Sequence, residues 1–228
     1  MKIISTRNIY VIGDLHIGNQ NYRGDLLKGT LDKIEPEAEI IGAGDYCEFI
    51  NKKSFDYDSQ TMPPEKQFKE FRRLFKPFAE RGQLITMLKG NHEDRYFKKL
   101  DMLEMWCEQY EIPYFGRHFV FNKGDITIYA HHPQSSATTT AGRSTVFRKM
   151  RDVQEADIYL TGHFHSLFQE SSYRYNRDRI LTEKFFACTG SYLEYKGSYA
   201  ELKLYTPNPM GCKKITIENN NIEIGDFI

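Results

Sequence analysis

The sequence has little cysteine and no excess of charge of either sign. Its 228 residues include four cysteines, and no two of them form a C-x-x-C pair. This scarcity argues against both a cysteine zinc site and a disulfide framework. Lysine and arginine together number 31, as do aspartate and glutamate. The chain therefore has no overall positive electrostatic potential that would attract nucleic acid or an anionic membrane. Any site that binds an anion must owe its charge to nearby residues.

Long apolar runs are also lacking. None approaches the roughly 20 residues that span a bilayer, and the opening MKIISTRNIYVIGD has no apolar core of a signal peptide. Internal repeats, low-complexity tracts and linkers are absent from the sequence. We therefore expect a soluble, cytoplasmic protein with reduced cysteines and no membrane partner, folded as a single domain over residues 1–228.

What the sequence does contain is a series of short β-rich runs that end in polar residues. These runs are residues 8–14, 38–45, 84–91, 126–132 and 157–163. Between them, residues 65–82 place apolar side chains at helical spacing, with a kink or an end near Pro77, and residues 93–110 and 143–156 are also predicted helices. The C-terminal third, including 183–191, 199–206 and 213–220, is predicted as mostly strands. This pattern indicates helices layered around packed sheets.

Metal-competent side chains stand at the ends of the five β-rich runs. In chain order they are Asp14 and His16, Asp45, Asn91 and His92, His131 and His132, and His163 and His165. Each alone is explained by a turn or a cap. Together, at one sheet edge, they would be costly to desolvate without cations. The mixture of carboxylate, imidazole and amide suits Mn, Fe or Zn rather than Ca, and predicts two divalent ions.

The ordered series D-x-H, G-D, G-N-H-E, H and G-H-x-H, spanning residues 14–165, closely resembles the calcineurin-like metallophosphoesterase superfamily. The resemblance implies an α/β (α+β) fold, a four-layer αββα sandwich of two mixed β-sheets flanked by helices. It also implies hydrolysis of phosphoester bonds by attack of a metal-bridging hydroxide. Two divalent transition metal ions are then expected as cofactors, with Mn favoured over Fe, Zn, Co or Ni.

The resemblance further implies a ligand set. One metal would be held by Asp14, His16 and His165, the other by Asn91, His131 and His163, with Asp45 bridging both. Of the two adjacent histidines in AHHPQ, the first is favoured because relatives with an H-x-P arrangement use it. His132 would then support a ligand from behind or contact substrate.

Catalytic and substrate-binding roles follow from the same resemblance. His92 corresponds to a non-ligand histidine that stabilises the equatorial oxygens or protonates the leaving group, with Asp14 or a neighbouring carboxylate orienting it. Asn91 adjoins His92 and is expected to touch substrate. Arg143, after a Ser- and Thr-rich stretch from 134 that should lie over the metal centre, either binds a substrate phosphate or simply opens a helix.

Two other stretches leave alternatives open. In GDYCEF, Glu48 and Phe49 stand where protein phosphatases of this superfamily carry Asp-Arg. Glu48 either accepts a hydrogen bond from a ligand histidine or starts a helix. Residues 171–179, SSYRYNRDR, interleave tyrosine and arginine, which fits either single-stranded nucleic acid binding or a polar hairpin.

The expected substrate is a phosphoester, with a phosphodiester, a nucleotide or nucleic acid favoured over small phosphomonoesters. A phosphoprotein phosphatase is disfavoured because the arginine after Glu48 is missing. A non-catalytic, protein-binding scaffold is the alternative from a different class, and the complete ligand set argues against it.

Overall fold

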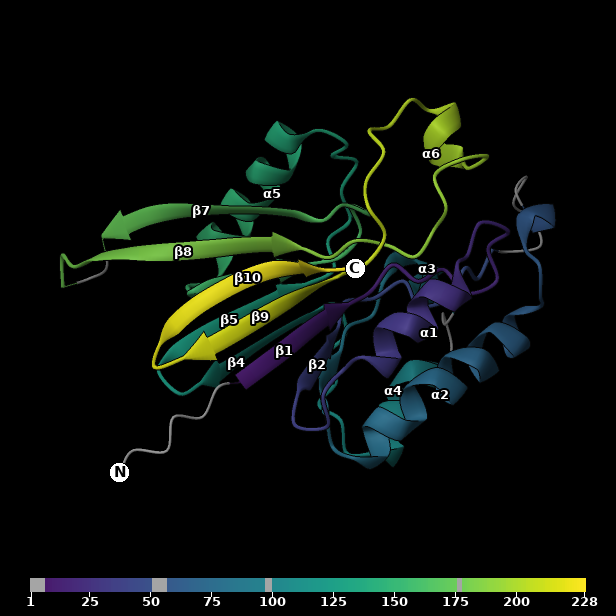
Figure 1. The fold of residues 1–228 in the computed structure, drawn as a ribbon, viewed down its shortest axis with the longest axis horizontal. Coiled ribbons are helices and arrows are strands. Elements are labelled where there is room, and N and C mark those ends of the chain that lie inside the picture. Colours follow the sequence, from purple (N-terminus) through teal and green to yellow (C-terminus); the bar gives the residue numbers. More distant parts are fainter. Residues whose placement is uncertain (1–6, 51–56, 97–99, 176–177) are drawn as a thin grey trace.

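Two β-sheets packed face to face, with helices on both outer sides, form the computed structural model of the chain (Figure 1). The structure describes residues 7–50, 57–96, 100–175 and 178–228. This arrangement confirms the αββα sandwich expected from the sequence. Each of the five β-rich runs singled out above contains a strand.

The two sheets have five strands each. The first is built from β1 (Arg7–Ile12), β2 (Glu39–Gly42), β3 (Leu84–Met87), β9 (Cys212–Glu218) and β10 (Asn221–Phe227), in the order β10-β9-β1-β2-β3. The second is built from β4 (His118–Lys123), β5 (Ile126–His131), β6 (Ile158–Thr161), β7 (Phe168–Tyr175) and β8 (Leu181–Cys188), in the order β4-β5-β6-β8-β7. β1, β2 and β3 run parallel to one another, as do β5, β6 and β8.

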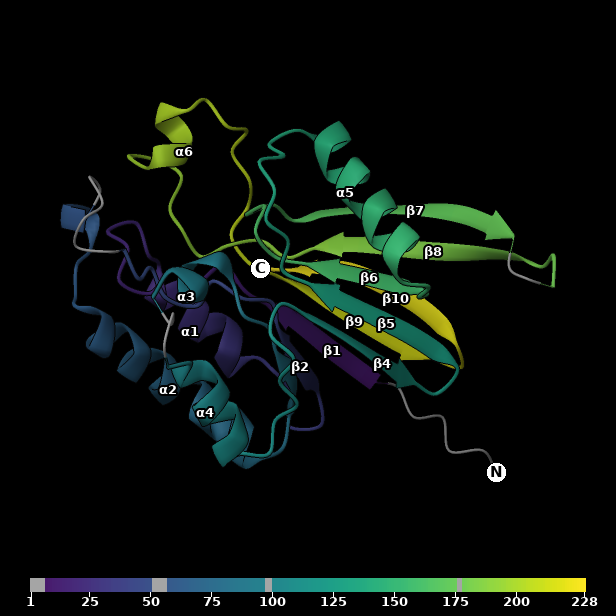
Figure 2. The ribbon, with the colours of Figure 1, turned by 180° about the vertical axis from the view of Figure 1, so that it is seen from behind.

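Helices cover the outer face of each sheet (Figures 1 and 2). α1 (Gly24–Asp32), α2 (Pro64–Glu80) and α4 (Met102–Gln109) lie on the first sheet, and α5 (Thr140–Val153) lies on the second. The short α3 (Asn91–Tyr96) follows β3, and α6 (Tyr199–Leu202) stands between β8 and β9. Across the described part of the chain, no helix combines the length and apolarity required to cross a bilayer.

Three apolar layers hold these elements together. Phe71 and Phe75 of α2 pack with Trp106 of α4 against the first sheet, which bears out the amphipathic pattern read from the sequence. Isoleucine and valine side chains from both sheets fill the space between them. Phe147 of α5 packs on the outer face of the second sheet. The two sheets are thereby fixed relative to each other, and so are their strand ends.

Three local expectations need correction. Residues 199–206 were expected in a strand, but 199–202 form α6, because the Ser198 hydroxyl accepts the N–H groups of Ala200 and Glu201 and caps a helix. The predicted helix over 93–110 is two helices, α3 and α4, and residues 97–99 between them lie outside the described ranges. α2 continues through Pro77 to Glu80.

Candidate metal centre

The polar residues predicted at the strand ends meet on one side of the sandwich. In the first sheet, Asp14 and His16 follow β1, Asp45 follows β2, and Asn91 and His92 follow β3. In the second sheet, His132 follows β5, and His163 and His165 follow β6. Because parallel strands present their carboxyl ends at the same edge, both sheets contribute to one site. Backbone hydrogen bonds join the loops, since the N–H groups of Leu15 and His16 donate to the carbonyl oxygen of Asp45.

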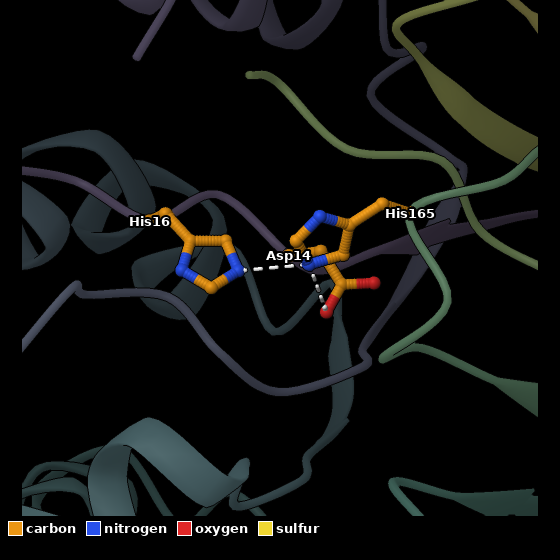
Figure 3. Close-up of side chains that lie close together, drawn as sticks. All are labelled: Asp14, His16 and His165. Carbon is orange, nitrogen blue, oxygen red and sulfur yellow. Dashed lines mark hydrogen bonds and ion pairs between the residues drawn. The ribbon is translucent and has the colours of Figure 1, made fainter. Parts of the chain in front are cut away.

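One cluster consists of Asp14, His16 and His165, whose ligand atoms all lie within 4.8 Å of one another. Nε2 of His16 is 3.0 Å from Nε2 of His165, which in turn is 3.9 Å from Oδ1 of Asp14 (Figure 3). The opposite nitrogen of His16, Nδ1, lies 2.9 Å from Oε2 of Glu48. A proton on Nδ1 leaves the Nε2 lone pair directed at the cluster, which is the orientation a metal ligand requires.

A second cluster joins Asp45, His132 and His163, also within 4.8 Å. The Asn91 side-chain oxygen lies 3.2 Å from Nε2 of His132 and 2.9 Å from Nδ1 of His163. Each histidine is held from outside by a backbone carbonyl, that of Ala43 at 2.6 Å from His132 Nδ1 and that of Ser135 at 2.5 Å from His163 Nε2. Both lone pairs therefore face the Asn91 oxygen.

These converging groups fit a cation. Imidazole nitrogens, carboxylates and the Asn91 side-chain oxygen face one another in each cluster, and a divalent ion bound between them would satisfy their lone pairs. With its amide turned over, Asn91 instead donates N–H groups to Asp45, His132 and His163. Asp45 belongs to a group with His16 and His92 as well as to the second cluster, so its carboxylate lies between the two.

The structure reverses the order expected for the two adjacent histidines. His132 is fully buried in the second cluster, whereas the ring of His131 lies beside those of His118 and Tyr129, away from it. The reason is strand alternation, because Ile128 and Ala130 of β5 face the other sheet and His132 continues that face. His131, predicted as a metal ligand, therefore lies outside the clusters of described residues, and the parity of the strand could have revealed this.

His92 lies beside the clusters, with its ring 4.5 Å from that of His16. Its Nδ1 is 2.5 Å from the carbonyl oxygen of Glu48, and its backbone N–H donates to Oδ1 of Asp45. Burial lowers the pKa of His92 to about 4, so the ring is neutral at pH 7. The partner of its Nδ1 is thus the backbone carbonyl of Glu48 rather than the expected carboxylate of Asp14 or a neighbouring residue. Both oxygens of Asp14 accept the N–H of His163.

Protons on the histidines offset part of the charge of the buried carboxylates. Burial lowers the pKa of His132, but the Asp45 carboxylate outweighs it and raises that pKa to about 9. Burial likewise lowers the pKa of His16, but Glu48 outweighs it and raises that pKa to about 9. Burial raises the pKa of Asp14 to about 7. A bound cation would take over this compensation and release protons.

Glu93 is an organising residue that the sequence reading did not single out. Its Oε1 accepts the backbone N–H groups of Tyr46 and Cys47, and its Oε2 accepts those of Asp45 and Gly90. This one buried carboxylate therefore ties the loop after β2 to the loop after β3. A Cβ on Gly90 would lie 2.1 Å from Oδ1 of Asp45, so only glycine allows this close approach.

The loops also hold a strained backbone. Asp14, His16, Asp45, His163 and His165 all have φ between +48° and +79°. Left-handed backbone at a residue other than glycine costs of order 1–3 kcal/mol, and clusters of such residues are typical of functional sites. The packing of the two sheets and the hydrogen bonds to Glu93 hold these conformations in place.

A cleft of about 760 Å³ opens above the clusters. One wall is formed by residues 135–138 and Arg143, and the other by residues 19–21 and by the segment from 191 to 208. A smaller hollow of about 390 Å³, lined by Asn91, Arg95, His163 and residues 134–136, adjoins it. The stretch expected over the metal centre therefore borders both hollows.

Arg143 lies at the start of α5 and is 7% exposed. Its guanidinium lies 5.6 Å from the centre of the Phe168 ring, and its Nε has no hydrogen-bond partner. None of the ion pairs formed by the residues described includes Arg143. A buried cation at the edge of a cleft, without a carboxylate beside it, is suited to an anionic ligand.

The tyrosine- and arginine-rich stretch belongs to a hairpin, β7–β8, that reaches away from this site. β7 runs antiparallel to β8, so Tyr173 and Tyr175 approach the end of the sheet opposite the metal clusters (Figure 1). Both side chains are exposed. The hairpin interpretation is confirmed, and residues 176–177 of the stretch lie outside the described ranges.

Replacing Glu93 with glutamine tests its organising role. The amide nitrogen would face backbone N–H groups, so Glu93→Gln is expected to lower the free energy of unfolding by roughly 2–4 kcal/mol. Glu104→Gln makes the same change at an exposed position of α4 and serves as the control. Urea denaturation measures both. Equal stability of the two variants would mean that Glu93 does not hold the loops together.

No curated protein matches the chain in sequence. Among solved structures, a conserved uncharacterized protein of Streptococcus pneumoniae, described as a predicted phosphoesterase, is 14% identical over 99% of this chain and 91% of its own, with a TM-score of 0.48. Vacuolar Protein Sorting 29 of Cryptosporidium parvum is 16% identical over 97% of this chain and 98% of its own, with a TM-score of 0.49. Similarity at this level carries no argument about activity.

The family model described as calcineurin-like phosphoesterase matches residues 7–167, which include β1 to β6 and all the polar strand ends described above. The family is metal-dependent, in agreement with the clustered potential ligands. The chain therefore belongs to the calcineurin-like phosphoesterase family.

Proposed function

We propose that this chain is a binuclear metal-dependent hydrolase that cleaves phosphodiesters. The observation that carries the proposal is the convergence of two donor clusters around Asp45, in which three of the histidines have their outer nitrogen tied to an acceptor. That arrangement leaves each inner lone pair available to a cation. It also argues against a non-catalytic scaffold, which would have no use for a complete donor set.

The proposed ligands follow from the clusters. Asp14, His16 and His165 would hold one ion, Asn91, His132 and His163 the other, and Asp45 would contribute to both. His132 takes the role expected of His131. Nitrogen and oxygen donors favour Mn, Fe, Zn, Co or Ni, with Mn as our first choice. Two such ions bound here would acidify a water molecule and neutralise the charge on a phosphate.

Side chains of the cleft would act on the substrate directly. The Nδ1–H of His92 is tied to the Glu48 carbonyl, so its Nε2 carries a lone pair. This nitrogen would accept the proton that the attacking water loses and pass it to the leaving oxygen. Arg143 would bind a non-bridging phosphate oxygen through its guanidinium. Asn91 would help orient the same phosphate.

This assignment explains why the chain can dispense with the arginine of the protein phosphatases. Phe49, which stands at that position, is 1% exposed and stacks on Tyr96 with ring centres 4.8 Å apart. It offers no contact to a phosphate. The two hollows that meet at Asn91 and His163 instead give room for a substituent on either side of a phosphodiester.

Metal content tests the ligand assignment. Protein purified without chelator is expected to hold about two transition-metal ions per chain. His132→Ala removes a ligand of one ion, so plasma mass spectrometry should find about one equivalent, whereas His131→Ala should retain two. A lower metal content in His131→Ala than in His132→Ala would reverse the assignment, and a wild-type protein without metal after exposure to Mn²⁺ would refute the proposal.

Turnover of bis-p-nitrophenyl phosphate with Mn²⁺ tests His92. Loss of a proton-transferring group costs roughly 10²- to 10⁴-fold in rate, so His92→Ala should lose activity on that scale while its metal content stays at the wild-type level. His118→Ala, at an exposed position of β4, is the control. Unchanged turnover in His92→Ala would rule out a catalytic role for this ring.

Steady-state kinetics on the same diester test Arg143. A lost charge-assisted hydrogen bond corresponds to about 10- to 100-fold in kcat/KM, which is the decrease expected for Arg143→Ala. Arg148→Ala, on the exposed face of α5, should match the wild type. Equal values for the two variants would remove Arg143 from the substrate site.

A further inference from the structure

The segment between β8 and β9, residues 189–211, is a long excursion that carries α6 and stands beside the N-terminal end of α5 (Figures 1 and 2). We refer to it as the α6 excursion. It is anchored at both ends. Leu193 pairs with Tyr22 in a β-bridge, Glu194 donates its N–H to the Asn21 carbonyl at 2.8 Å, and the Ser166 hydroxyl donates to the Asn208 side chain at 2.9 Å. These anchors fix it as a wall of the cleft.

The wall presents aromatic surface to the cleft. Tyr195, Tyr199 and Tyr205 all line it. The Tyr195 hydroxyl donates to the Tyr205 carbonyl at 2.8 Å, and the rings of Tyr199 and Tyr205 meet edge to face at 6.0 Å. Tyr199 is 61% and Tyr205 37% exposed. Exposed aromatic surface gathered at a cleft marks a binding site for an apolar or flat ligand.

The same cleft supplies hydrogen-bonding groups. Asn19, Gln20, Asn21, Thr206 and Asn208 line it together with the tyrosines. An alkyl chain would form no hydrogen bonds with these amides and hydroxyls. A nucleobase has both a flat face to stack on tyrosine and a polar edge that amide groups recognise.

Charge and size limit the ligand to a small one. The basic residues that line the cleft are Arg95 and Arg143. A nucleic acid polymer requires several phosphates to be neutralised along its backbone, which two arginines do not provide. The cleft volume of about 760 Å³ matches small-molecule sites, which measure about 300–1,000 Å³.

We propose that the α6 excursion binds the nucleobase of a small phosphodiester, with the base stacked against Tyr199 and Tyr205 and the phosphate at the donor clusters. The proposal rests on the phosphodiesterase function proposed above. Hydrolysis would add water to phosphorus and break one P–O bond. The departing alcohol takes a proton, and a nucleoside monophosphate remains.

Two chromogenic diesters that share a leaving group test the proposal on the Mn²⁺-loaded full chain. Thymidine 5′-(p-nitrophenyl phosphate) carries a nucleoside, whereas methyl p-nitrophenyl phosphate does not. The wild type should prefer the nucleoside ester in kcat/KM. Base stacking on an aromatic side chain is worth about 1–3 kcal/mol, so Tyr199→Ala and Tyr205→Ala should each lower that preference by about 5- to 100-fold. Tyr173→Ala, on the remote hairpin, should keep the wild-type preference.

The outcomes separate this inference from the proposed function. Hydrolysis with the same preference in all four proteins, or faster hydrolysis of octyl p-nitrophenyl phosphate, overturns the nucleobase assignment and leaves the phosphodiesterase standing. Hydrolysis of none of the esters overturns the phosphodiesterase. In that case the binding of thymidine monophosphate, measured by calorimetry, tests whether the α6 excursion binds a nucleobase. Weaker binding in Tyr199→Ala and Tyr205→Ala, but not in Tyr173→Ala, supports this role. Any other pattern refutes it.

Discussion

The site depends on the desolvation of electron-pair donors that face one another. Asp14, Asp45, His16 and His132 are buried, and their side chains converge within 4.8 Å of their partners in each cluster. Such an arrangement is unfavourable unless protons or cations compensate it. The carboxylates of Glu48 and Asp45 raise the pKa values of His16 and His132, so a proton on each imidazole offsets part of this negative charge. The same groups are the ones that a divalent cation would bind.

The surrounding structure holds these residues together despite the free-energy cost of burying them. Four backbone N–H groups from two loops share the Glu93 carboxylate, and the left-handed conformations at five donor residues are fixed between the sheets. Histidines held by Glu48, Ala43 and Ser135 cannot turn their inner nitrogens away without losing those bonds. The site is thus preorganised, so a cation would bind it without a large rearrangement.

The cleft above the site has a different chemistry from the site itself. Below lie carboxylates and imidazoles, and above lie the tyrosines and amides of the α6 excursion. A phosphodiester suits this arrangement, because its charged phosphate would lie at the donor clusters and its organic substituents would contact the tyrosines and amides. The excursion is also the place where the sequence interpretation failed, since residues 199–202 were expected in a strand. There a local serine cap outweighed the alternation of apolar residues.

The sequence by itself determined the five strands that lead into the site, the order of their polar ends and the resemblance to the family, because strand periodicity and motif spacing are local properties. It also located the amphipathic α2. For Glu48 it left two roles open, a helix start or an acceptor for a histidine, and the structure shows Glu48 beside His16 Nδ1. Only the tertiary structure decided which of His131 and His132 enters the site, that Glu93 joins two loops, and that the α6 excursion forms a wall of the cleft. These features depend on which face of a strand is buried and on contacts between segments far apart in the chain, which arise only when the two sheets pack together.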